Sequence, residues 1–154
     1  MYKRQALKAL SPGINDTTTA VTCVDYLATI LARLAARQIP ASHRYEDGEL
    51  RVIAKGPSFQ SLVGESFDQI RESAKGNLGI MLRMLAALQT IASLTANPSH
   101  RHALHEQVES IAELAERTIE SPHDRTCFER YSGQVRVALT SGPILSIYEQ
   151  PTEA

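Results

Sequence analysis

The segment NLGIMLRMLAALQTIASLTA, residues 77–96, contains the longest apolar run of the chain. Its apolar side chains recur at intervals of three and four residues, which is the period of a helix that buries one side. Arg83 and Gln89 interrupt the run, so it falls short of the ~20 apolar residues that a membrane span needs. No other segment approaches that length. We therefore predict the central helix of a soluble domain, with these core positions: Leu78, Met81, Leu82, Leu85, Leu88, Ile91 and Ala92.

Helix-breaking residues on both sides of this segment separate it from further helices. Gly76 and Asn77 close the helix before it, and Asn97, Pro98 and Ser99 form the break after it. We expect helices at about residues 17–37, 58–75, 100–119 and 123–139, and the end of another helix at 6–10. Their expected core positions are Val21, Val24, Leu27, Ile30, Leu31 and Leu34; Phe59, Leu62, Val63, Phe67 and Ile70; Leu104, Val108, Ile111, Ala115 and Ile119; Cys127, Tyr131, Val135 and Leu139.

A β-hairpin signal lies between the first two long helices. Asp47 and Gly48 separate two short β-prone runs, residues 43–45 and 50–53. An isolated two-stranded hairpin is marginally stable, so we expect it to lie on the helices. The predicted fold class is mainly all-α: an antiparallel helical bundle, favoured by short connections, with a small inserted β-hairpin near residues 44–53.

Composition limits the classes of function. The chain has 154 residues with 43% hydrophobic and 21% charged residues, which fits one globular domain. A formal net charge of -1 argues against nucleic acid as a partner, because phosphate binding needs clustered positive charge. The N-terminus of this chain lacks the continuous apolar segment of a secretory signal, so we expect none. Cys23 and Cys127 are expected to be buried free thiols, since a disulfide would need an oxidising compartment.

The N-terminal residues suggest a boundary. Residues 1–5, MYKRQ, resemble the translated end of a sequencing-library adapter, and residues 6–10 read as the last turns of a helix whose beginning is absent. The hypothesis is therefore a non-native scar at 1–5, a single helical domain at 6–146 that is truncated at its N-terminus, and a tail at 147–154. A longer genomic read that encodes the same five residues inside an intact gene would refute the scar.

The most distinctive loop is SPGIND at residues 11–16. Pro and Gly end the preceding helix, and Asn15 or Asp16 is a strong N-cap candidate for the next one. A helix N-terminus can hold an anion, and Asp16 could instead coordinate a cation or act as a base. The simplest interpretation is a cap, with a contact surface as a further alternative. The residues assigned to this binding or contact loop are Ser11, Pro12, Gly13, Asn15, Asp16, Thr19 and Arg71.

Other polar clusters favour ordinary surface roles. His102, His105 and Glu109 could share a helix face and bind zinc, but solvated histidines at a helix start, His100 included, are the simpler interpretation. Glu65, Asp68 and Glu72 could do acid–base work as paired carboxylates, but Asp68 and Arg71, three residues apart, more simply form a surface pair. No Walker-type phosphate loop and no Gly-x-Ser-x-Gly elbow is present. We therefore expect no catalytic residues, no metal and no cofactor.

Several stretches resemble a known family, the bacterial predicted membrane proteins of domain-of-unknown-function family 2254. They are ALKALSPGIND at 6–16, TTAV at 18–21, CVDYL at 23–27, DGELRV at 47–52 and SFDQIR at 66–71. Thr17 departs from the family, which often has Pro there, but both residues suit a first helical turn. The resemblance implies an inner-membrane protein with an N-terminal part of several spans, followed by this soluble part on the cytoplasmic side.

Three hypotheses of function follow. The first is a non-enzymatic soluble C-terminal domain that serves assembly or regulation through helix–helix contacts, with the 11–16 loop facing the transmembrane region of the same chain or a second copy. The second is a sensor for a small ligand or ion, with a pocket at Asp16 that includes Arg71 or Asp25. The third is a hydrolase or lyase with Asp16 as base, which requires a second titratable group nearby.

Overall fold

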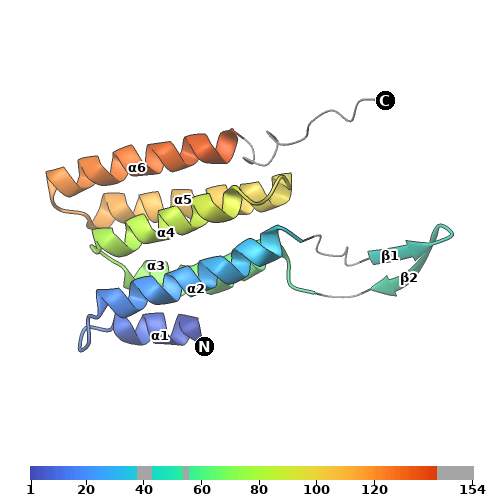
Figure 1. The fold of residues 1–154 in the computed structure, drawn as a ribbon, viewed down its shortest axis with the longest axis horizontal. Helices are drawn as coiled ribbons and strands as arrows, with labels where there is room; N and C mark the ends of the chain where they lie inside the picture. The colour runs from blue at the N-terminus through green and yellow to red at the C-terminus, as the bar shows by residue number, and fades with distance from the viewer. Residues whose placement is uncertain (38–42, 54–55, 142–154) are drawn as a thin grey trace, which may run out of the picture.

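The computed structural model describes residues 1–37, 43–53 and 56–141. The elements in these ranges are α1 (Tyr2–Ala9), α2 (Thr17–Ala35), β1 (His43–Glu46), β2 (Glu49–Ile53), α3 (Phe59–Ser73), α4 (Leu78–Ala92), α5 (Pro98–Thr118) and α6 (Pro122–Thr140). Helices that follow each other along the chain run in opposite directions, and the hairpin extends from one end (Figure 1). The predicted all-α bundle with a small hairpin is confirmed. The predicted tail at 147–154 lies outside the described residues.

Helix α4 is the centre of the bundle, as its sequence predicts. It packs against α2, α5 and α6, and its N-cap Asn77 accepts a hydrogen bond from the backbone N–H of Ile80 at 3.1 Å. Leu78 and Leu82, expected in the core, are only partly buried, whereas Ile80 and Met84 are fully buried. The difference arises because helices cover α4 on more than one side, so its buried face is wider than one apolar stripe.

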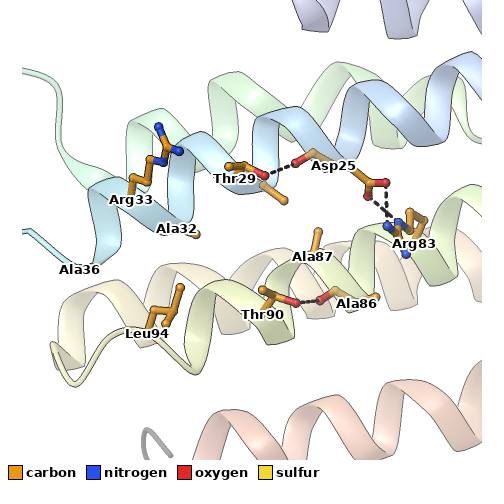
Figure 2. A pocket seen from close by; sticks show the side chains of 11 residues that line it. Asp25, Thr29, Ala32, Arg33, Ala36, Arg83, Ala86, Ala87, Thr90 and Leu94 are labelled. Carbon is orange, nitrogen blue, oxygen red and sulfur yellow. Dashed lines mark hydrogen bonds and ion pairs between the residues drawn. The ribbon is translucent and has the colours of Figure 1, made fainter. Parts of the chain in front are cut away.

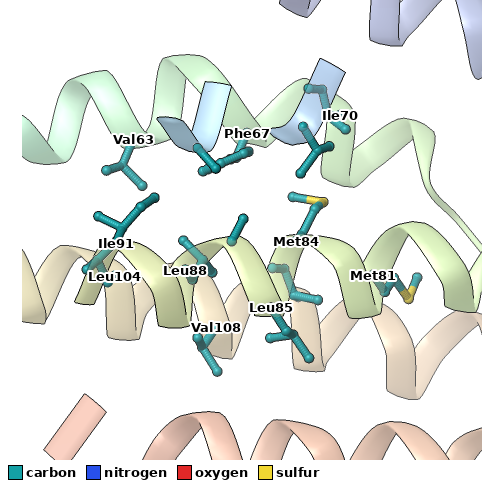
Figure 3. Close-up of a cluster of buried hydrophobic side chains, with 14 of the residues drawn as sticks. Val63, Phe67, Ile70, Met81, Met84, Leu85, Leu88, Ile91, Leu104 and Val108 are labelled. Atoms are coloured by element: carbon teal, nitrogen blue, oxygen red, sulfur yellow. The ribbon is translucent and has the colours of Figure 1, made fainter. Parts of the chain in front are cut away.

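Helices α3 and α5 lie behind α2 and α4 in Figure 1 and match their predicted core faces closely. All five predicted core positions of α5 are buried, and so are four of the five on α3, Leu62 being partly buried. Figure 3 shows α3, α4 and α5 meeting in one apolar cluster that includes Val63, Phe67, Ile70, Met84, Leu88, Ile91, Leu104 and Val108.

Helix α2 buries a different face from the predicted one. Val24 and Leu31 are buried, but Ile30 is 47% exposed. Small residues occupy the inner face instead: Ala20, Cys23, Ala28, Ala32 and Ala35. Small side chains let α2 approach its neighbours closely, so the buried face is shifted toward the alanines: Val21, Leu27 and Leu34 are only partly buried and Ile30 is left exposed.

The expectation that no segment suits a membrane span is wrong for α2 by length and composition. This helix has 19 residues and a mean hydropathy of 1.2. However, Asp25 lies near its middle and forms an ion pair with Arg83 of α4. A charge at that depth would be costly in a bilayer, and α2 packs against α1, α3 and α4 within the bundle.

Helix α6 is rotated relative to the prediction. Val135 and Leu139 are buried as expected, but Phe128 and Ser132 are buried where Cys127 and Tyr131 were predicted. The prediction that both cysteines are buried therefore holds for Cys23 and fails for Cys127, which is half-buried; both are free thiols. Neighbouring positions on a helix are about 100° apart, so a one-residue error moves the predicted face by that angle.

Arg101, near the start of α5, forms hydrogen bonds to the ends of two other helices. One of its Nη atoms donates to the carbonyl oxygens of Ala92 and Thr95, at 3.0 and 3.2 Å. The other donates to Ala138 at 3.1 Å and also to Leu139. These carbonyls lie at the C-terminal ends of α4 and α6. The last carbonyl groups of a helix lack partners within that helix, and they attract positive charge.

The hairpin forms where it was predicted, but it does not pack on the helices as expected. Tyr45 pairs with Leu50, and Glu46 with Glu49. Asp47 and Gly48 both have positive φ angles, 52° and 79°, which is the backbone of a tight turn that matches strand twist. Every described side chain from residue 45 to residue 53 is exposed. The apolar side chains of this hairpin therefore face solvent.

Candidate functional site

The loop at residues 11–16 folds back on the end of α1. The hydroxyl of Ser11 donates to the carbonyl of Lys8 at 2.7 Å. The backbone N–H of Asp16 donates to the carbonyl of Ala9 at 2.7 Å. Asn15 adopts the left-handed conformation, with φ of 46°, which Asn tolerates better than most residues. Pro12 and Gly13 lie exposed at the tip of this turn.

Asp16 is the N-cap of α2, as predicted. Its Oδ1 accepts a hydrogen bond from the backbone N–H of Thr19 at 3.0 Å, and its Oδ2 accepts one from the Thr19 hydroxyl at 2.5 Å. These two bonds hold the pKa of the Asp16 carboxyl below its usual value of 3.8. Both carboxylate oxygens therefore already have partners within the helix end.

The structure separates Arg71 from this loop. Arg71 lies on α3, pairs with Asp68 at 3.6 Å, and lines cavities between α3 and α5. Asp25, the other polar residue expected near Asp16, is paired with Arg83. Ser11, Pro12, Gly13, Asn15, Asp16 and Thr19 line none of the four cavities described. A ligand at this loop stays a prediction.

The histidines of α5 have two different environments. His102 and His105 are exposed, as predicted, at 3.4 Å from Glu106 and 3.7 Å from Glu109. His100 is only 6% exposed and stacks on Phe59, so the prediction that it is solvated is wrong. Burial lowers the pKa of His100. Within residues 1–37, 43–53 and 56–141, no three His, Cys, Asp or Glu side chains lie together as metal ligands would.

A groove between α2 and α4 is the best-defined apolar cavity, with a volume of about 500 Å³. We call it the α2–α4 groove. Its α2 wall contains Ala28, Ala32 and Ala36, which are four residues apart and so form one row along the helix. Its α4 wall contains Ala86, Ala87 and Thr90, and Figure 2 shows the two walls facing each other. Small side chains on both walls let the two helices approach closely, so Ala28, Ala32 and Ala87 are buried, whereas Ala36 is exposed and Ala86 is partly exposed.

The threonine hydroxyl groups that line this groove already have hydrogen-bond partners. Thr29 donates to the carbonyl of Asp25 at 2.9 Å, and Thr90 donates to the carbonyl of Ala86 at 3.0 Å. Both hydroxyls are thus satisfied within their own helices, which leaves methyl groups to contact an occupant. The middle of the groove is therefore apolar.

Charged side chains mark the ends of the groove. Asp25 accepts two hydrogen bonds from Arg83, at 2.5 Å and 2.6 Å, and this bidentate pair connects α2 to α4 at one end (Figure 2). The bond from Nε raises the pKa of Arg83 further above its ordinary range. Arg33 and the 38% exposed Leu94 lie at the other end. This arrangement suits an apolar helix with polar flanks.

The α2–α4 groove was not predicted from the sequence, although part of its signal was available. The row of alanines at spacing four was visible, but the larger residues of the same helix were assigned to the core. The Asp25–Arg83 pair joins positions 58 residues apart, so no local pattern indicates it. The groove is lined by small apolar side chains, two threonines and charged residues at its ends, which is a geometry suited to binding.

The chain matches a known protein family over more than half of its length. A family described as "Predicted membrane protein (DUF2254)" matches residues 5–90, a range that includes the 11–16 loop and both walls of the α2–α4 groove up to Thr90. The chain is also similar to uncharacterized proteins of Mycobacterium bovis and of two strains of Mycobacterium tuberculosis. Each is 31% identical over 121 residues.

The matched region covers 78% of this chain but only 23% of each mycobacterial relative. This chain therefore spans about a quarter of the length of those relatives. No solved structure matches it.

Proposed function

Because the chain belongs to the DUF2254 family of predicted membrane proteins, we propose that it is the soluble C-terminal domain of a bacterial integral membrane protein of unknown function. In this proposal the domain is non-enzymatic and serves assembly or regulation. The α2–α4 groove is the observation that carries it: an apolar groove lined by small residues, on a helix whose most apolar 18-residue window is 33% buried.

The proposed occupant of the groove is a helix from the remainder of the same full-length protein. Most of each relative lies outside the matched region, which provides the length for such a helix. The 18-residue window of α2 with the highest hydropathy is only 33% buried in the bundle. An apolar helix left this exposed favours contact with a further protein segment.

The shape of the groove indicates how that helix would dock. The alanines of both walls allow close backbone approach, so the contact would depend on shape and apolar burial rather than on hydrogen bonds. Asp25 and Arg83 are already neutralised by each other and would select the register by excluding large apolar side chains at that end. Arg33 would pair with an acidic residue or a polar helix end on the occupant.

Photo-crosslinking in membranes tests this docking. A benzoylphenylalanine at Thr90, inside the groove, would be compared with one at Thr126 on α6 in the full-length protein. Both threonines are exposed, and each donates to the carbonyl four residues earlier, at 3.0 Å. The two positions therefore differ mainly in their place on the surface.

The expected result is an adduct at Thr90, mapped by mass spectrometry to a segment outside the domain, and no such adduct at Thr126. Adducts confined to the domain, or adducts to an unrelated protein, would contradict the proposal. A crosslinked dimer joined groove to groove would replace the proposed occupant by a second copy of the chain.

We also propose that the full-length protein is in the bacterial inner membrane with this domain on the cytoplasmic side. Two free cysteines support a reducing compartment. Protease treatment distinguishes the two sides. The domain should survive protease added to intact spheroplasts and be cleaved in inverted membrane vesicles; the opposite pattern would place it in the periplasm.

A further inference from the structure

A second cavity, of about 660 Å³, lies between α3 and α5 and differs in chemistry from the groove. We call it the α3–α5 trough; it is lined by side chains from residues 60–71 of α3 and 103–113 of α5. Five of the lining residues are carboxylates: Glu65, Asp68, Glu106, Glu109 and Glu113. Among the lining side chains, Arg71 is the one arginine or lysine. The trough therefore has a negative potential.

Only part of this negative charge is neutralised. Glu109 accepts two hydrogen bonds from Arg136 of α6, at 2.7 and 2.9 Å, which hold the pKa of its carboxyl low. Asp68 pairs with Arg71 at 3.6 Å. Within the part of the chain that the structure describes, Glu65 and Glu113 have no ion-pair partner. A cation would thus be attracted into the trough.

One residue that lines the trough, Gln107, has an unsatisfied polar atom. Gln107 is 8% exposed, and its Nε2 donates to Oδ1 of Asp68 at 2.6 Å. Its Oε1 is buried, and no donor among the described residues reaches it. Reversing the amide would place two acceptor oxygens 2.6 Å apart, so the orientation is fixed. A buried acceptor without a donor is destabilising, and a donor from a ligand would satisfy it.

Gly64 makes room for this arrangement. A Cβ atom at Gly64 would lie 3.0 Å from Oδ2 of Asp68, closer than such contacts normally occur. Glycine within a helix is unfavourable by about 1 kcal/mol relative to alanine. Its presence leaves room for the Asp68 carboxylate, whose other oxygen accepts the hydrogen bond from Gln107.

We propose that the α3–α5 trough binds an organic cation that carries N–H donors, an ammonium or guanidinium group. Such a group matches the negative lining and supplies the donor that Oε1 of Gln107 lacks. A metal ion fits less well, because no three metal-ligating side chains converge within the described residues. A free polyamine and an arginine side chain carry this same chemistry.

Titration of the purified chain with four probes tests the proposal. Spermidine represents a free polyamine, acetyl-argininamide represents a basic side chain, tetramethylammonium supplies charge without N–H donors, and calcium chloride represents a metal ion. Binding is followed by amide chemical shifts of α3 and α5. Saturable shifts with spermidine or acetyl-argininamide are expected, and the tighter of the two identifies the source.

Variants separate recognition from folding. Gln107→Met keeps the side-chain volume and removes the unsatisfied oxygen, so the fold should persist while affinity falls about tenfold or more. Asp68→Asn, at a half-exposed carboxylate, should weaken binding by a similar factor. Glu116→Gln, an exposed residue of α5 that does not line the trough, is the matched control and should change affinity less than about twofold.

Three results would overturn the proposal. Tetramethylammonium binding as tightly as spermidine would show that charge alone is recognised. Preferential binding of calcium would replace the organic cation by a metal ion. Absence of saturable shifts with both N–H cations, while circular dichroism shows a folded chain, would exclude the site.

Discussion

The α2–α4 groove and the α3–α5 trough lie at two seams, by which we mean the lines along which neighbouring helices meet. The helices of both seams cover the same apolar core. The first is lined by alanines and by threonines whose hydroxyls are bonded within their own helices. The second is lined by carboxylates and by Gln107, which connects α5 to α3 through Asp68. Both seams are open to solvent, yet they have opposite chemical character.

The difference teaches how a helix pair can leave a surface for a partner. Small side chains form most of the α2–α4 contact, with the Asp25–Arg83 pair at one end, so what remains exposed between them is mainly apolar and favours burial against another helix. Hydrogen bonds and charges close the α3–α5 contact, so what remains is unbalanced charge, which favours a cation. The same bundle therefore presents two surfaces that suit different partners.

The largest expected effect tests whether both seams depend on the shared core. Leu88 is fully buried on α4, and Leu88→Ala should lower the free energy of unfolding by about 3 kcal/mol, through lost burial and a cavity. Urea denaturation followed by circular dichroism measures it, with a single transition expected. Val137→Ala, at a 65% exposed side chain, is the control. Two separate transitions would show that the seams fold independently.

A second prediction compares two arginines. Arg101→Met should cost about 2 kcal/mol, because charged hydrogen bonds to carbonyls at the ends of α4 and α6 are lost. Arg83→Met should cost less than about 1 kcal/mol, since its ion pair with Asp25 across the groove is half-exposed. Urea denaturation of both variants gives the difference. Equal losses would mean that the groove depends on its ion pair rather than on packing.

A third prediction concerns pH and His100, which stacks on Phe59 at the start of α3. Burial lowers the pKa of His100, and a backbone contact with Ala35 opposes this only in part. The unfolded chain therefore takes up the proton first. Stability should be fully present above the ordinary value of 6.5 and decrease as pH falls from there through the lower folded pKa.

Thermal denaturation between about pH 5 and 7 measures this loss. Carboxylates with lowered pKa values change the stability only at lower pH, so they do not interfere in this range. His100→Phe should remove most of the dependence while keeping the stacking on Phe59. An unchanged slope in this variant would assign the acid sensitivity to other groups.

The smallest expected effect concerns the start of the groove helix. Asp16→Ala removes the N-cap of α2 and should lower the melting temperature, but by less than Leu88→Ala does. Asp16→Asn keeps an acceptor for the Thr19 N–H and should stay near wild type. The contribution of Asp16 should be present above its usual pKa of 3.8 and be lost as pH falls through the lowered value. A large loss in Asp16→Asn would show that its charge, rather than capping, matters.

Much of the fold was predictable because local signals determine it. Apolar spacing located α3, α4 and α5, and Asp47-Gly48 located the hairpin turn. Asp16 was correctly identified as a cap candidate. The errors, Ile30 on α2 and Cys127 on α6, concern helices that bury small residues or a rotated face. Periodicity alone does not decide which side of such a helix faces its neighbours.

The two surfaces proposed for binding were not predicted. Gln107 gives no sequence signal of being buried, and its pairing with Asp68 joins positions 39 residues apart. The 11–16 loop was assigned as a binding or contact loop because Pro, Gly, Asn and Asp together are distinctive. The structure shows that its hydrogen bonds serve the ends of α1 and α2.

The amino-acid sequence by itself determined the helices, their caps and turns, most of the core of α3, α4 and α5, and the family. These features depend on residues within a few positions of each other, where propensity and periodicity act. Only the tertiary structure decided that α2 turns its alanines toward α4, that Arg83 meets Asp25, and that Gln107 is buried beside carboxylates. These outcomes depend on which helices approach each other and how closely, because side-chain volume and charge are matched across contacts between distant residues.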